Sequence, residues 1–164
     1  MQKFVKFYIL LLVIFIGLGL LGFSITKDDE VSDELEAQAI KQTPGYETML
    51  AISEMTKEQQ LQDAVLDIQV QPDQNNDIVL IKLQSSEFMS SDILLKDTYN
   101  MLQNIAQSKK IAEITFIWYQ VLHNKNTEVL TMTFDRTSLD QISKVSHTDL
   151  SNIATNYEQH SEFQ

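Results

Sequence analysis

The sequence predicts an α+β protein that consists of an N-terminal transmembrane helix and a ββαββ domain. We expect a four-stranded, mainly antiparallel sheet in this domain, covered by one helix and flanked by short helices. Three observations lead to this prediction. The chain opens with a long apolar run, two pairs of strand-like segments follow, and one segment with helical periodicity separates the pairs.

The apolar run covers residues 7–26 and contains no charged residue. A helix of about 20 residues is about 30 Å long, which is the thickness of the hydrocarbon core of a bilayer. Lysines precede the run and acidic residues follow it. The positive-inside tendency therefore predicts that residues 1–6 are cytoplasmic and that the C-terminal domain is extracytoplasmic, on a single-pass membrane protein.

A cleaved signal peptide is the alternative interpretation of this run. Gly22 and Ser24 would place small residues at the −3 and −1 positions of a cleavage site. The apolar core of a signal peptide usually has about 7–15 residues, and this run is longer, which favours a retained signal anchor. If the run were cleaved, the mature chain would be a secreted soluble factor.

The charge of the chain limits its partners. The sequence has 12 basic and 23 acidic residues, with a net charge of −11, and Arg136 is its only arginine. Such a chain repels nucleic acid and anionic lipid head groups, so we expect no nucleic-acid partner. Cysteine is absent, which excludes disulfides, thiolate metal sites and thiol catalysis.

Residues 27–63 are predicted to form an acidic tether that contains short helices. Residues 31–40 are consistent with a capped helix or with a flexible linker. Apolar residues at helical spacing predict an amphipathic helix over 44–55, and a second short helix is expected over 56–61.

The globular domain is predicted to span residues 64–145, and it begins with a hairpin. Apolar and polar residues alternate over 66–70, which is typical of a half-buried strand. Residues 72–77 have the composition of a turn. The segment 78–83 is more evenly apolar and predicts a second, more buried strand.

A helix and a second hairpin complete the predicted domain. The segment 91–108 has one apolar face and an acidic first turn, which predicts the covering helix. The segment 111–122 is rich in β-branched and aromatic residues and predicts a central strand. A polar turn over 123–127 and a strand over 129–134 follow.

Short helices are predicted at the end of the chain, over 137–145 and 148–157. Ser138 and Gln141 match a capping box in the first of them. Residues 146–164 are therefore expected to form a C-terminal helix and tail.

One segment resembles part of a calcium-binding loop. Asp73, Asn75 and Asp77 match its first three ligand positions, but Ile78 replaces the invariant glycine and Gln84 replaces the bidentate glutamate. The segment is more simply a polar hairpin turn. The three histidines lack metal-ligand spacing as well, so we expect neither a metal nor a cofactor.

Catalytic signatures are also absent from the sequence. There is no nucleophile elbow, and Gly45 is the only glycine after the apolar run, so a glycine-rich phosphate cradle is missing. With 23 acidic residues, a carboxylate pair for glycan or peptide hydrolysis stays open as an alternative. We nevertheless expect a binding protein in preference to an enzyme.

Three aromatic residues of the central strand form the candidate site. Phe116 and Trp118 fall on one face of the strand and Tyr119 on the other. They are interpreted either as core packing against the helix or as anchors for a partner protein if one sheet face is uncovered. The sequence thus predicts a protein-binding or assembly module, a candidate subunit of a membrane or envelope complex.

Overall fold

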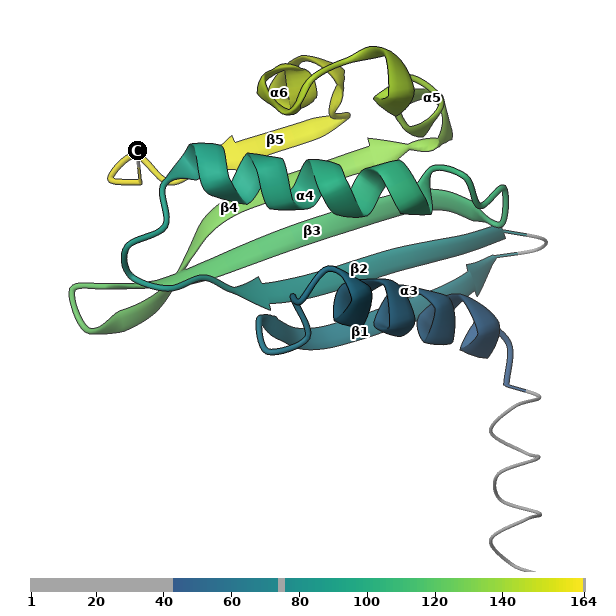
Figure 1. Cartoon of the computed structure of the whole chain (residues 1–164), viewed down its shortest axis with the longest axis horizontal. Coiled ribbons are helices and arrows are strands. Elements are labelled where there is room, and N and C mark those ends of the chain that lie inside the picture. Colours follow the sequence, from purple (N-terminus) through teal and green to yellow (C-terminus); the bar gives the residue numbers. More distant parts are fainter. Residues whose placement is uncertain (1–42, 74–75, 164) are drawn as a thin grey trace, which may run out of the picture. The chain divides into compact units, whose positions relative to one another are not determined.

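A five-stranded mixed sheet forms the centre of the described part of the chain, residues 43–73 and 76–163 of this computed structural model (Figure 1). The α+β class predicted from the sequence is confirmed. The elements, in chain order, are α3 (Tyr46–Glu58), β1 (Val65–Asp73), β2 (Asn76–Gln84), α4 (Ser91–Ile105), β3 (Ile111–Leu122), β4 (Lys125–Asp135), α5 (Arg136–Leu139), η1 (Ile142–Lys144), η2 (His147–Asp149), α6 (Leu150–Ile153) and β5 (Asn156–Gln159).

The predicted membrane segment, residues 7–26, lies outside the described residues, as do residues 1–6, predicted to be cytoplasmic, and the first part of the predicted tether. Within the described residues, no helix has the length and apolar character needed to cross a membrane. The compact unit that these residues form begins at Pro44 and includes α3 and the C-terminal elements.

The strands follow the order β1-β2-β3-β4-β5 across the sheet. β2 and β3 are parallel, whereas the other neighbouring pairs are antiparallel. The parallel pairing follows from α4, because parallel neighbours require a crossover connection and α4 supplies it between β2 and β3. The ββαββ order of the first four strands is therefore as predicted.

The predicted number of strands was wrong, because β5 adds a fifth strand at the edge beside β4. The sequence predicts a helix over 148–157, but the helix there, α6, ends at Ile153. β5 has four residues, and Tyr157 is its one half-buried member. Such a short, polar edge strand has no alternating apolar pattern from which it could be recognised.

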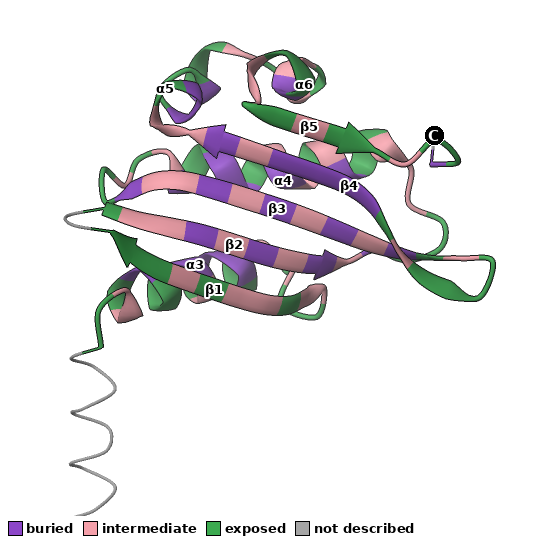
Figure 2. Cartoon of the chain, turned by 180° about the vertical axis from the view of Figure 1, so that it is seen from behind, coloured by how far each residue is buried: buried purple, intermediate pink, exposed green. Residues whose placement is uncertain are grey.

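Two helices, not the single one predicted, cover one face of the sheet. Figures 1 and 2 show α3 and α4 on the same side of the strands, and side chains from both helices line one groove. The separate helices predicted over 44–55 and 56–61 are one continuous helix, α3. The covered face therefore extends to β1, where Val65, Ile68 and Val70 are partly buried against the core.

Gly45 allows α3 to pack against β1. Its φ is +82°, in the left-handed region that side chains disfavour. A Cβ on Gly45 would also lie 2.8 Å from Cγ1 of Val70. The helix therefore begins at a position that only glycine occupies without strain.

Arg136 closes the C-terminal end of α4. Its guanidinium donates hydrogen bonds to the carbonyl oxygens of Ala106, Ser108 and Ile111, at 2.9, 2.8 and 3.2 Å. The last carbonyls of a helix lack partners within the helix, and a cation at this end also complements the helix dipole. The only arginine of the chain thus has a structural role.

Candidate functional site

The two faces of the sheet have different surroundings. Val79, Ile81 and Leu83 of β2 point toward the helices and are at most 1% exposed. Because alternate strand residues point to opposite faces, Leu80 and Lys82 point away from the helices. Figure 2 views the sheet from this second side, and no helix of the described residues lies over it.

The centre of this second side is apolar and half-buried. Four half-buried apolar residues of this side belong neither to the core cluster nor to the side chains packed against it: Ile78 and Leu80 of β2, and Ile117 and Tyr119 of β3. In the register, Leu80 lies opposite Thr115 and Ile117 lies opposite Lys82, so the four form a diagonal band that steps from β2 to β3. The uncovered face, as we call this side, includes Asp67, Gln69, Gln71, Ile78, Leu80, Lys82, Gln84, Glu113, Thr115, Ile117, Tyr119, Val121, Glu128, Thr131, Thr133, Asn156 and Glu158.

Acidic side chains surround the apolar centre of the uncovered face. Asp67, Glu113, Glu128 and Glu158 come from four different strands. The one basic residue of the face is Lys82, whose Nζ lies 3.6 Å from Oδ2 of Asp67. The uncovered face thus combines an apolar centre with a negatively charged rim.

The structure separates the three aromatic residues that the sequence singled out. Phe116 and Trp118 are 0% and 1% exposed and belong to the core between the sheet and the helices. Tyr119 is half-buried and lies on the uncovered face. Tyr119 is therefore the member of this cluster that a partner can contact without disrupting the core.

The indole N–H of the buried Trp118 has a hydrogen-bond partner. The indole Nε1 donates to Oγ1 of Thr98 at 2.9 Å, and this hydroxyl donates to the carbonyl oxygen of Leu94 at 2.8 Å. A buried indole N–H needs such an acceptor. The arrangement ties β3 to the middle of α4.

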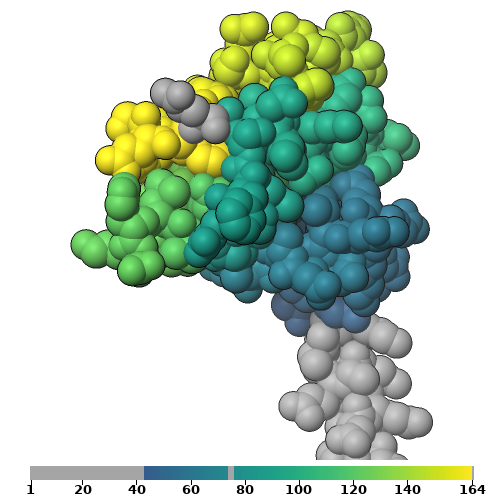
Figure 3. Space-filling model, turned by 60° about the vertical axis from the view of Figure 1, so that its left-hand side comes forward, coloured from purple at the N-terminus to yellow at the C-terminus, as the bar shows by residue number. Residues whose placement is uncertain are grey.

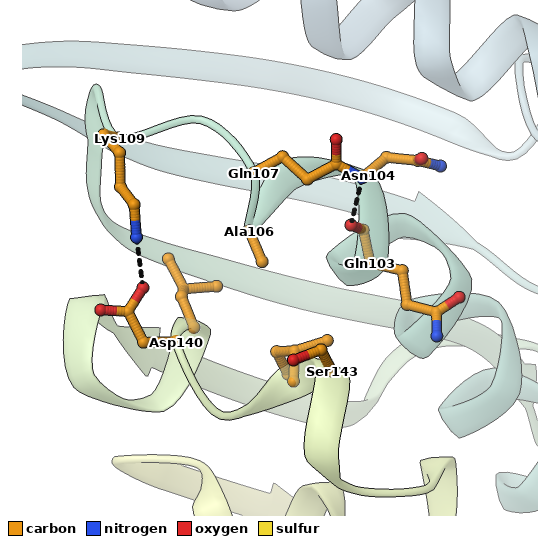
Figure 4. A pocket seen from close by; sticks show the side chains of 9 residues that line it. Gln103, Asn104, Ala106, Gln107, Lys109, Asp140 and Ser143 are labelled. Carbon is orange, nitrogen blue, oxygen red and sulfur yellow. Dashed lines mark hydrogen bonds and ion pairs between the residues drawn. The ribbon is translucent and has the colours of Figure 1, made fainter.

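A polar pocket of about 470 Å³ lies between the C-terminal end of α4 and the α5–η1 segment (Figure 4). Its floor consists of aliphatic side chains, and amide groups and one hydroxyl stand around it. The lining residues are Gln103, Asn104, Ala106, Gln107, Lys109, Leu139, Asp140, Ile142 and Ser143.

Asp140 is the only carboxylate that lines this pocket, and it is held by two cations. Lys109 Nζ lies 2.7 Å and Arg136 Nη2 lies 2.8 Å from its Oδ1. The hydrogen bond from Lys109, and then that from Arg136, lowers the pKa of Asp140. A carboxylate stabilised in its charged form is poorly suited to act as a general acid.

A smaller, mainly apolar groove of about 140 Å³ lies between α3 and α4. No acidic residue lines it. The lining residues are Thr48, Ala51, Ile52, Met55, Asn104, Ile105, Ser108 and Ile111. Burial raises the pKa of Asp97, but this residue lines neither the groove nor the polar pocket. Neither cavity contains the pair of facing acids that a carboxylate-based hydrolase requires.

The described residues contain no group of three or more histidine, cysteine, aspartate or glutamate side chains that could hold a metal ion. Asp77, the second residue of β2, accepts a hydrogen bond from the Thr48 hydroxyl. His123 and His147 each lie beside a different acidic residue, Glu162 and Asp92.

Sequence reasoning missed the most exposed apolar side chain of the described residues. Phe88, in the loop between β2 and α4, is 93% exposed. Its neighbours in the sequence are polar except for Met89, so no periodic pattern marks it. The sequence allowed only a conditional prediction of an uncovered sheet face, because it does not show which face the helices cover.

Comparison with known proteins finds no family that matches this chain and no similar curated protein or solved structure. Any function must therefore be inferred from the geometry described above.

Proposed function

We propose that this chain is a membrane-anchored protein-binding module, and that its uncovered sheet face docks another protein of a membrane or envelope assembly. The observation that carries the proposal is the half-buried apolar centre of this face, a diagonal band of Ile78 and Leu80 on β2 and Ile117 and Tyr119 on β3 that lies outside the core. Apolar side chains that lie outside the core, with polar residues around them, are typical of a protein interaction site.

The charges of the uncovered face indicate the chemistry of the partner. Four carboxylates surround the apolar centre, and Lys82 is already close to one of them. A complementary surface has apolar side chains at its centre and lysine or arginine side chains at its edge. Such complementary charges accelerate association and exclude acidic competitors.

The proposed anchor is the apolar segment 7–26, which is predicted from the sequence alone. A membrane anchor would restrict the domain to a thin layer near the bilayer and so raise its effective concentration toward other membrane proteins. N-terminal sequencing of the mature protein tests this part of the proposal. A chain that begins after residue 24 would identify a secreted factor instead.

A reversal of charge on the rim tests the docking surface. The full-length chain is tagged, crosslinked in native membranes and purified, as wild type and with Glu113→Lys and Glu158→Lys together. The control carries Glu54→Lys and Glu58→Lys, which change the net charge equally on exposed positions of α3.

The proposal predicts that the rim variant loses the partners that wild type and control both retain at constant stoichiometry. It also predicts that this association weakens as salt concentration rises. Equal recovery of the same partners by all three chains would show that the uncovered face is not the docking surface.

A further inference from the structure

Phe88 is presented to solvent by a rigid loop. The backbone N–H of Met89 donates to the carbonyl oxygen of Ser86 at 3.2 Å, which closes a tight turn with Glu87 and Phe88 at its tip. Gln120 of β3, which is only 3% exposed, donates from its side-chain amide to the carbonyl oxygens of Ser86 and Met89, at 2.7 and 3.1 Å.

Hydrogen bonds therefore hold the backbone of the turn that carries Phe88. Gln120 holds both ends of the turn with one buried amide, while Phe88 at its tip is 93% exposed. Exposure of a phenyl ring to water is unfavourable, and an exposed aromatic on a rigid support is typical of an interface hot spot. Preorganisation of this kind lowers the entropy cost of association.

The groove between α3 and α4 has a suitable size for the Phe88 ring. Its volume is about 140 Å³ and its lining is mainly apolar. An apolar protein cavity of about 150 Å³ accommodates benzene. Ala51 and Asn104 stand at its exposed rim, so a side chain can enter from the surface.

The Phe88 turn and the groove lie at opposite ends of α4. The turn directly precedes Ser91, the first residue of the helix, and Ile105, its last residue, lines the groove. The 15 residues of α4 span about 22 Å, so Phe88 does not reach the groove of its own chain. Figure 3 brings the end of the domain with the turn toward the viewer.

Charged residues at the two ends can pair across the contact. Glu87 precedes Phe88 and forms no ion pair within the described residues. Lys109 and Lys110 lie between the groove residues Ser108 and Ile111. Lys109 and Lys110 pair with Asp140 and Glu47 in the same chain, but both pairs are largely exposed, and exposed pairs contribute little to stability.

We infer that copies of this chain associate head to tail, with Phe88 of one copy inserted in the α3–α4 groove of the next and Glu87 near Lys109 and Lys110. The contact joins two different surfaces of the chain. The copy at one end of the array therefore keeps a free Phe88 turn, the copy at the other end keeps a free groove, and further copies can add at both ends. The 12-residue β3 sets the domain length at about 40 Å, which is the expected repeat of the array. The surface involved is separate from the uncovered sheet face, so this inference stands or falls independently of the proposed function.

Engineered disulfides test the head-to-tail contact directly, because the native chain has no cysteine. The full-length chain is expressed in native membranes with Glu87→Cys, with Asn104→Cys, or with both, and is then oxidised. We expect a ladder of multimers from the double variant. Each single variant stays monomeric, and co-expression of the two single variants yields a dimer and nothing larger.

Phe88→Ala in the double-cysteine chain is expected to reduce the ladder about tenfold or more. Ala51→Trp, which fills the groove, is expected to do the same. Leu50→Ala, at a residue of α3 that is 43% exposed, is the matched control and should keep the ladder. The fluorescence of Trp118, the only native tryptophan, verifies folding of the variants that add no tryptophan, and far-UV circular dichroism verifies it for Ala51→Trp.

Two results would overturn the inference. Dimers from either single-cysteine chain would indicate a two-fold contact between identical surfaces. A ladder that survives Phe88→Ala, or no ladder from a folded double variant, would show that Phe88 serves another contact, such as a different protein or a lipid surface.

Discussion

Trp118 and Tyr119 are neighbours in the sequence, but truncation of each to alanine is expected to have a different effect. Trp118→Ala should reduce stability, whereas Tyr119→Ala should remove partner binding. Trp118 is 1% exposed and packs between the sheet and the helices, so Trp118→Ala should cost about 3–5 kcal/mol of the free energy of unfolding. Small domains have a total stability of about 5–15 kcal/mol, so the loss is a large part of it.

Tyr119→Ala should cost no more than about 1 kcal/mol, because Tyr119 lies on the uncovered face and outside the core cluster. The same change should remove the bound partner of the full-length chain. Stability and binding are thus expected to separate between two adjacent positions of one strand.

The hydrogen bond of Trp118 can be measured apart from its packing. Thr98→Val keeps the shape of the side chain but removes the acceptor of the indole N–H, 2.9 Å away. A buried donor left without a partner costs about 1–3 kcal/mol. In a Thr98→Val and Trp118→Ala double mutant, the loss of unfolding free energy should differ from the sum of the two single losses, because the two residues are in contact.

Urea unfolding of the full-length chain in detergent, followed by far-UV circular dichroism, measures all of these changes. Trp118 emission provides a second signal for the variants that retain it. The reasoning would be refuted if Tyr119→Ala destabilised the domain as strongly as Trp118→Ala, because both faces of β3 would then be equally packed.

Three further predictions concern the described domain. Gly45→Ala should lower the free energy of unfolding by about 1–2 kcal/mol or more in urea titrations, because the left-handed φ and the approach to Val70 both oppose a Cβ; unchanged stability would contradict this. Arg136→Lys should speed amide hydrogen exchange in the last turn of α4 and cost about 1–3 kcal/mol, since an ammonium cannot bond all three carbonyls that the guanidinium reaches; unaltered exchange would count against this role. Asp97→Asn should raise the unfolding temperature at pH 7. Burial raises the pKa of Asp97 in the folded state, so ionisation of this carboxyl destabilises the fold as the pH rises. The gain in unfolding temperature from the substitution should therefore shrink toward pH 3, and a gain that stays constant with pH would contradict burial of Asp97 as its cause.

Much of the fold was predictable because the strands and α4 have clear patterns. The alternation in β1, the apolar β2 and the one-sided α4 each determine their structure locally. The crossover through α4 then makes β2 and β3 parallel, a consequence that the predicted mainly antiparallel sheet did not include. β5 was not predictable by the same means, because its pairing with β4 depends on tertiary contact and only Tyr157 turns inward.

The candidate site was less predictable, since it depends on which side of the sheet the helices cover. The sequence indicates that Trp118 and Tyr119 point in opposite directions, but only the structure shows that the core is on the side of Trp118. The exposed Phe88 and its support by Gln120 involve residues 32 positions apart in the chain, and no local pattern connects them.

The most direct test of the proposed docking surface is photocrosslinking from Ile117, at the centre of the uncovered face. A photoreactive side chain replaces Ile117 in one full-length chain and Leu50, on the exposed side of α3, in another. In native membranes, we predict a discrete protein adduct from position 117 that is absent from position 50 and is lost in the Glu113→Lys and Glu158→Lys chain. No adduct from position 117, or the same adducts from both positions, would contradict the claim that the uncovered face is where this protein binds its partner.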